Sequence, residues 1–117
     1  MFDILKVIAE ENMLNKEIIK ETVLSVMPTE IVDRVIIFGS RARGDATVDS
    51  DFDICIVTNV KLTYDDVKIY RGQMSRLFAF KHRIATDILI KSNSDMERYK
   101  NVVGAIENEI IREGVAV

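Results

Sequence analysis

The chain has 117 residues, a length that predicts one domain over residues 1–117 with a single hydrophobic core. Hydrophobic residues make up 48% and charged residues 30%, which excludes a disordered protein, and the net charge of −3 argues against direct binding of DNA phosphates. The single cysteine excludes an intrachain disulfide, and no apolar run has the length of a membrane span or the layout of a signal peptide. We therefore expect a cytoplasmic protein that does not bind membranes.

The first quarter of the chain has helical periodicity. Phe2, Leu5 and Ile8 recur at helical spacing and predict a first helix. A second helix is expected from about Asn15 to the residues before Pro28, because the residue that precedes a proline is disfavoured in the helical region. The residues expected to face inward on this second helix are Ile18, Ile19, Thr22, Val23, Val26 and Met27.

Three apolar runs predict the strands of one sheet. Residues 35–38 and 52–57 are continuous runs rich in β-branched residues, typical of strands that are covered on both faces. Residues 41–50 between them are too few for a packed helix with its loops, so we expect neighbouring strands joined by a loop or a single turn. Residues 64–80 have helical periodicity, and residues 84–90 form the third strand, which contains one acid.

The last part of the chain is again helical. Ser94 and Glu97 have the spacing of a capping box and open a final helical region, which Gly104 breaks or bends and Gly114 ends. The acids interpreted as the solvated face of this region are Glu107, Glu109 and Glu113. The resulting order, α-α-β-β-α-β-α, predicts an α+β fold in which helices pack on a small mixed sheet.

Three aspartates are candidate metal ligands. Asp51 and Asp53 project from the same face of a strand, and Asp87 lies inside an otherwise apolar strand. If the strands are adjacent, the three carboxylates share one edge, where their repulsion requires a shared proton or a hard divalent cation. Three carboxylates suffice for two Mg²⁺ ions about 3.5–4 Å apart. The alternative is a solvated strand entry, with Asp87 paired to a base such as Arg83.

The segment before these acids is a candidate phosphate site. Gly39 allows a ligand to approach the backbone closely, and the Ser40 hydroxyl can donate a hydrogen bond to a phosphate oxygen. Arg41 and Arg43 bring guanidinium groups that suit phosphate, or that form surface ion pairs with Asp45 or Asp49. A phosphate cradle next to a carboxylate pair predicts a site for a nucleoside triphosphate.

The spacing of these features resembles a known signature. The chain has Gly39-Ser40, then ten residues, and then Asp51 and Asp53. This spacing is similar to the motif of the polymerase β-type nucleotidyltransferase superfamily. The string GSRARGDATVDSDFDICIV resembles its smallest branch, the minimal nucleotidyltransferases. The resemblance implies a fold like the polymerase β palm, with Gly39 and Ser40 on the β- and γ-phosphates of ATP. Asp51 and Asp53 would ligate Mg²⁺, with Mn²⁺ as an alternative, and Asp87 would complete the site and help activate an acceptor hydroxyl.

The resemblance also implies a partner. Minimal nucleotidyltransferases commonly accompany a HEPN-domain protein in toxin–antitoxin pairs, and some transfer AMP to a tyrosine of the HEPN ribonuclease. Our first hypothesis is therefore a protein adenylyltransferase that silences a HEPN toxin. The alternatives are a non-catalytic, nucleotide-binding antitoxin that acts by complex formation and a nucleotidyltransferase for a small molecule. The sequence leaves open the acceptor, the preferred base, and whether the chain forms homo- or hetero-oligomers.

Overall fold

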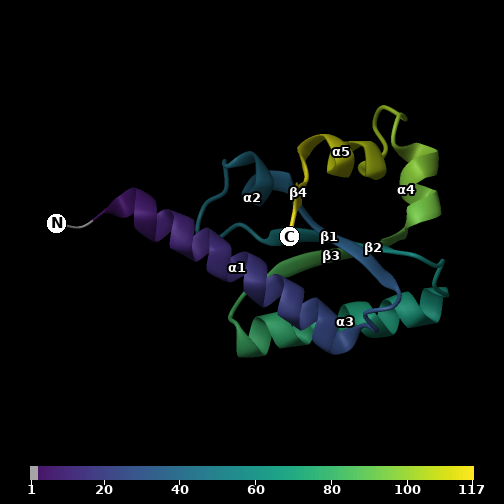
Figure 1. Ribbon diagram of the computed structural model, residues 1–117, viewed down its shortest axis with the longest axis horizontal. Coiled ribbons are helices and arrows are strands. Elements are labelled where there is room, and N and C mark those ends of the chain that lie inside the picture. The colour runs from purple at the N-terminus through teal and green to yellow at the C-terminus, as the bar shows by residue number, and fades with distance from the viewer. Residues whose placement is uncertain (1–2) are drawn as a thin grey trace.

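The computed structural model describes the backbone of residues 3–117 and the side chains of residue 3 and residues 15–117. The chain forms helices and strands in the order α1 (Ile4–Val26), β1 (Val32–Phe38), α2 (Gly39–Arg43), β2 (Phe52–Thr58), α3 (Tyr64–Lys81), β3 (Thr86–Ser92), α4 (Asn93–Tyr99), α5 (Ile106–Glu113) and β4 (Val115–Ala116). Figure 1 shows the sheet in the middle of the domain, with α1 and α3 on one side and α2, α4 and α5 on the other. The α+β prediction is confirmed.

The four strands form one mixed sheet in the order β3-β2-β1-β4. The predicted neighbours β1 and β2 pair antiparallel, and this pairing sets Phe38 opposite Asp53. Strand β3 pairs with β2 in the parallel direction and sets Asp87 opposite Asp53. The end of β1 and the beginnings of β2 and β3 therefore meet at the same end of the sheet.

Each face of the sheet buries its own apolar cluster. Because side chains alternate along a strand, Ile54 and Ile56 pack under α1 and α3, whereas Cys55 and Val57 pack with residues of α4 and α5. All four side chains have no exposed surface, which explains why β2 is apolar without interruption. Asp53 is two residues before Cys55, so it projects toward the face covered by α4 and α5.

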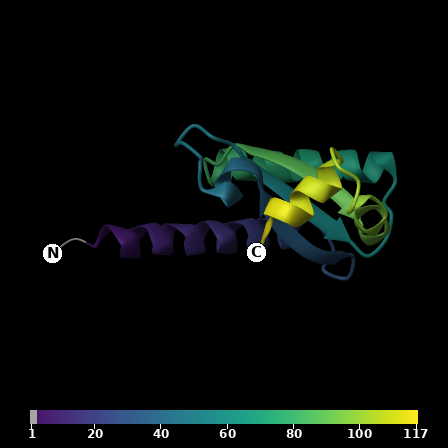
Figure 2. The same cartoon turned by 90° about the horizontal axis from the view of Figure 1, so that it is seen from above.

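The prediction of two N-terminal helices is wrong, because α1 is a single helix over Ile4–Val26. No glycine or proline lies between residues 4 and 26, so nothing in the backbone ends a helix near Asn15. The expected inward face is confirmed where it is described, since Ile19, Val23 and Met27 are buried. The prediction for Phe2, Leu5 and Ile8 lies outside the described part of the chain, which lacks residue 2 and the side chains of residues 5 and 8. Figure 2 shows the first half of α1 projecting beyond the rest of the domain.

The C-terminal region differs from prediction in its details. The Oγ atom of Ser92, rather than of Ser94, caps α4 by accepting a hydrogen bond of 3.2 Å from the backbone N–H of Asp95. The predicted break at Gly104 is confirmed: this residue has a φ of +90° and lies between α4 and α5. Gly114 ends α5 as predicted, and the two residues after it form β4, which is too short to leave a periodic pattern. None of the helices described has the length and apolarity needed to cross a bilayer.

Candidate functional site

The turn that follows β1 brings backbone and carboxylate into close contact. Gly39 is buried, has a φ of +68° and begins α2. A Cβ atom at this position would overlap the Oδ2 atom of Asp53. Glycine is thus required here for two reasons, the left-handed φ and the proximity of the Asp53 carboxylate. The first N–H groups of a helix lack intrahelical acceptors, so this turn presents backbone donors beside an acid.

The three predicted aspartates gather at this end of the sheet. Asp53 and Asp87 are paired in register on β2 and β3, and Asp51 lies just before β2. Asp53 is half-buried, whereas Asp51 and Asp87 are exposed. Within residues 15–117 these carboxylates accept no hydrogen bond and form no ion pair, so the alternative pairing of Asp87 with Arg83 is not found.

The electrostatics of Asp53 reflect this crowding of acids. Burial raises the pKa of Asp53, and the charges of Asp87, Asp51 and Glu109 raise it further, while the charge of Arg43 acts in the opposite direction. A site of this kind favours either a proton on Asp53 or a cation among the carboxylates. Among the described side chains, however, no three acids, histidines or cysteines converge in an arrangement that could hold a metal ion.

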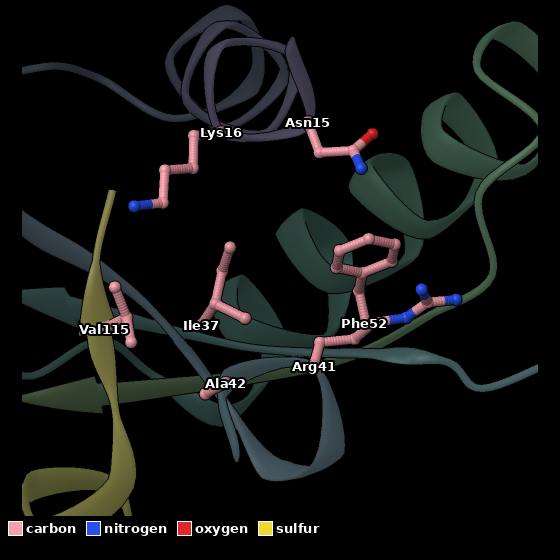
Figure 3. A pocket seen from close by; sticks show the side chains of 7 residues that line it. All are labelled: Asn15, Lys16, Ile37, Arg41, Ala42, Phe52 and Val115. Atoms are coloured by element: carbon pink, nitrogen blue, oxygen red, sulfur yellow. The ribbon is translucent and has the colours of Figure 1, made fainter. Parts of the chain in front are cut away.

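The two arginines of the motif lie in different places. The guanidinium group of Arg41 lies over the Phe52 ring, with Cζ 4.5 Å from the ring centroid, and its Nη2 atom donates a hydrogen bond of 2.8 Å to the carbonyl of Ser50. Figure 3 shows Arg41 and Phe52 side by side. Because side chains alternate along β2, the Phe52 ring projects from the face opposite Asp53. The structure therefore places Arg41 at the loop that leads into β2.

Arg43 instead pairs with two acids, and its charge acts on Asp53. Its Nε atom lies 3.3 Å from Asp45 and its Nη1 atom 3.1 Å from Glu113, and these hydrogen bonds raise the pKa of Arg43. The predicted pair with Asp45 is thus present, and the sequence analysis missed the partner on α5. The prediction that Glu107, Glu109 and Glu113 form a solvated face is wrong for Glu107, which is buried, and Glu109 and Glu113 are half-buried. The charge of Glu109, one turn before Glu113, acts on Asp53. Their i, i+4 spacing is visible in the sequence, but the element that they face is set by tertiary packing.

A cavity of about 230 Å³ lies near the same end of the sheet and is shown in Figure 3. It is lined by Asn15, Lys16, Ile37, Arg41, Ala42, Phe52 and Val115. Ile37 and Phe52 belong to the face that α1 and α3 cover, and the three aspartates are not among its described lining residues. The cavity is therefore separate from the cluster of acids.

Comparisons with known proteins identify the fold and the family. A family model described as nucleotidyltransferase domain matches residues 16–114. A crystal structure of a toxin–antitoxin with AMP-PNP matches with a TM-score of 0.64 and 17% identity, over 87% of this chain and 71% of that chain. A putative nucleotidyltransferase from Sulfolobus solfataricus matches with a TM-score of 0.57 and 27% identity, over 89% and 76% of the two chains.

A third similar structure contains a tri-AMPylated HEPN toxin from Shewanella oneidensis in complex with an MNT antitoxin, with a TM-score of 0.53 and 15% identity. This match covers 89% of the present chain and 69% of the other. A search of curated proteins gives no match to the chain. At these identities, the likeness to the two toxin–antitoxin structures establishes a shared fold.

Proposed function

The chain belongs to the nucleotidyltransferase domain family, and from this premise we propose that it transfers AMP from Mg-ATP to a hydroxyl group of a partner protein. The observation that carries the proposal is the contact between the Gly39 turn and the Asp53 carboxylate, with Asp87 in register beside it. This contact brings backbone donors for phosphate and oxygen ligands for a cation to one point. Transfer of a nucleotide requires both.

The acids suit a hard divalent cation. Asp51, Asp53 and Asp87 offer only carboxylate oxygens, the ligands that Mg²⁺ and Mn²⁺ prefer, and in the described structure none of them forms an ion pair. We propose that these three residues hold the metal, as two ions, together with oxygens of the triphosphate, because the three carboxylates do not by themselves converge on one point in the described structure. When bound, the metal neutralises charge on the triphosphate and makes an acceptor hydroxyl more acidic.

The remaining residues of the site have roles that follow from their chemistry. The Ser40 hydroxyl and the first N–H groups of α2 would donate hydrogen bonds to the β- and γ-phosphates. Arg43, which pairs with Asp45 and Glu113 and whose charge acts on Asp53, would contact the same phosphates. The acceptor oxygen bonds to the α-phosphorus as the bond to pyrophosphate breaks. Asp87, which is exposed, would receive the hydroxyl proton.

The acceptor that we propose is a HEPN-type toxin, with this chain as its antitoxin. Support comes from the shared fold with one toxin–antitoxin structure that contains AMP-PNP and another that contains an AMPylated HEPN toxin. The motif that resembles the minimal nucleotidyltransferases agrees with this assignment. Silencing would then follow from covalent modification of the toxin.

The test uses the purified chain, Mg-ATP and a purified HEPN-domain toxin as the candidate acceptor. Intact mass spectrometry should show the partner gaining the mass of one or more AMP groups, and Asp53→Asn should abolish the gain because it removes a metal ligand. A stable complex that silences the partner without a mass change would contradict the enzyme proposal and favour a non-catalytic antitoxin. Release of pyrophosphate only when a small hydroxyl compound is added would favour a small-molecule substrate.

A further inference from the structure

The side chain of Arg41 links two parts of the chain that the proposed reaction needs. Arg41 belongs to α2, the short helix that begins with Gly39 and Ser40. Its guanidinium group reaches nine residues ahead, where Nη2 donates to the Ser50 carbonyl at 2.8 Å. The same group lies 4.5 Å from the centroid of the Phe52 ring. Arg41 thus contacts the residues immediately before and after Asp51.

Asp51 itself has few constraints of its own. Its side chain is exposed, and within the described residues it has no hydrogen-bond or ion-pair partner. Its position therefore depends on the two peptide groups that flank it. One carries the Ser50 carbonyl bound by Arg41, and the other carries the N–H of Phe52, which donates to the carbonyl of Ala85 at 2.9 Å. Arg41 provides one of these two attachments.

The geometry of Arg41 differs from that of a surface arginine. Its Nε atom is buried and has no hydrogen-bond partner, a loss that is unfavourable for a polar donor. An arginine oriented toward water would avoid that loss. The planar guanidinium can stack on a ring and donate in its own plane at once, which an ammonium group cannot do. The side chain is therefore held between α2 and the start of β2 despite the cost at Nε.

We propose that Arg41 is a positioning residue that fixes Asp51 relative to the phosphate-binding turn. The inference rests on the proposed function, because it assigns Asp51 to the metal. Arg41 then acts on metal binding through Asp51 and makes no direct contact with the triphosphate. One five-residue helix would in this way present the phosphate donors and hold the first metal ligand in register with them.

A double-mutant cycle tests this role. ATP affinity is measured by calorimetry with Mg²⁺ and with EDTA for the unmodified chain, Arg41→Ala, Asp51→Asn and the double variant. Arg41→Ala should reduce the affinity gained from Mg²⁺ about 10–100-fold, the usual effect of removing a residue that orients a metal ligand. It should leave the affinity in EDTA unchanged. In the Asp51→Asn background, Arg41→Ala should hardly change the affinity gained from Mg²⁺, because the metal ligand that Arg41 positions is already absent.

Two further outcomes separate this inference from the proposed function. If Arg41→Ala weakens ATP equally in EDTA and in both backgrounds, Arg41 contacts phosphate directly and the positioning role is overturned. If Asp51→Asn leaves the Mg²⁺-dependent affinity unchanged, the proposed metal site itself is overturned. Arg41→Lys guards against a folding defect: it keeps a donor within reach of Ser50 and should restore part of the Mg²⁺-dependent affinity. If a folded Arg41→Lys variant loses all of the Mg²⁺-dependent ATP affinity, the positioning role of Arg41 is also overturned.

Discussion

Alanine at Gly39 should separate the cost of a backbone conformation from the cost of displacing a carboxylate. Gly39 has a φ of +68°, and an L-residue in this region loses about 1–2 kcal/mol. For a domain of this size that loss lowers the melting temperature by about 4–8 °C. The new Cβ atom would also overlap Oδ2 of Asp53, so either the turn or the carboxylate must move. Gly39→Ala should therefore lose stability and also bind Mg-ATP more weakly.

Gly104→Ala is the matched control for this change. Gly104 has a φ of +90°, but, its own chain neighbours aside, no atom of the described residues lies within 4 Å of the position that its Cβ would take. It should lose a similar amount of stability in a thermal melt, about 1–2 kcal/mol, and bind Mg-ATP as the unmodified chain does. If calorimetry finds equal Mg-ATP affinity for the two variants, the contact between Gly39 and Asp53 has no role in the site and our reasoning fails.

Three other predictions concern Asp53, Ser40 and Cys55. The pKa of Asp53 is raised in the folded protein, so the ionised carboxylate destabilises the fold at neutral pH. Asp53→Asn should therefore have a higher melting temperature than the unmodified chain at pH 7 without metal. The difference in melting temperature should shrink as the pH falls through the acid range, because protonation removes that charge. Ser40→Ala should leave the melting temperature nearly unchanged and weaken ATP binding several-fold, by about 0.5–1.5 kcal/mol, as measured by calorimetry. Burial raises the pKa of Cys55 to about 12, so a thiol reagent at pH 8 should modify it only after denaturation, as mass spectrometry can verify.

The centre of the fold could be predicted because its signals are local. The apolar runs of β1 and β2 each stop at polar residues, and the short segment between them permits only neighbouring strands. Once β3 pairs with β2, the alternation of side chains sets the face on which Asp87 lies. The positions of Gly39, Asp53 and Asp87 near one another followed from these few constraints.

The parts that could not be predicted depend on tertiary contacts. Strand β4 has two residues and forms only because it can pair with β1. The ion pair between Arg43 and Glu113 joins residues 70 positions apart, and no periodicity reveals it. The contact of Arg41 with Ser50 and Phe52 has the same origin, since the sequence offered an arginine near acids and phosphate donors but not the direction of its side chain.

Two partly or fully buried acids of the fold, Glu107 and Asp53, differ in whether a cation pairs with them. This difference supports a ligand site at the end of the sheet where Asp53 lies. Glu107 is 7% exposed, and Lys91 lies 3.3 Å from its carboxylate, so the fold supplies a counter-charge where an acid is buried. At the sheet end burial and neighbouring acids raise the pKa of Asp53, yet in the described structure it has no ion-pair partner. A chain shaped only by stability would neutralise Asp53 as it does Glu107. Acids kept in an unfavourable environment mark a binding or catalytic site, and the ligand that we propose for this one is a metal-bound nucleotide.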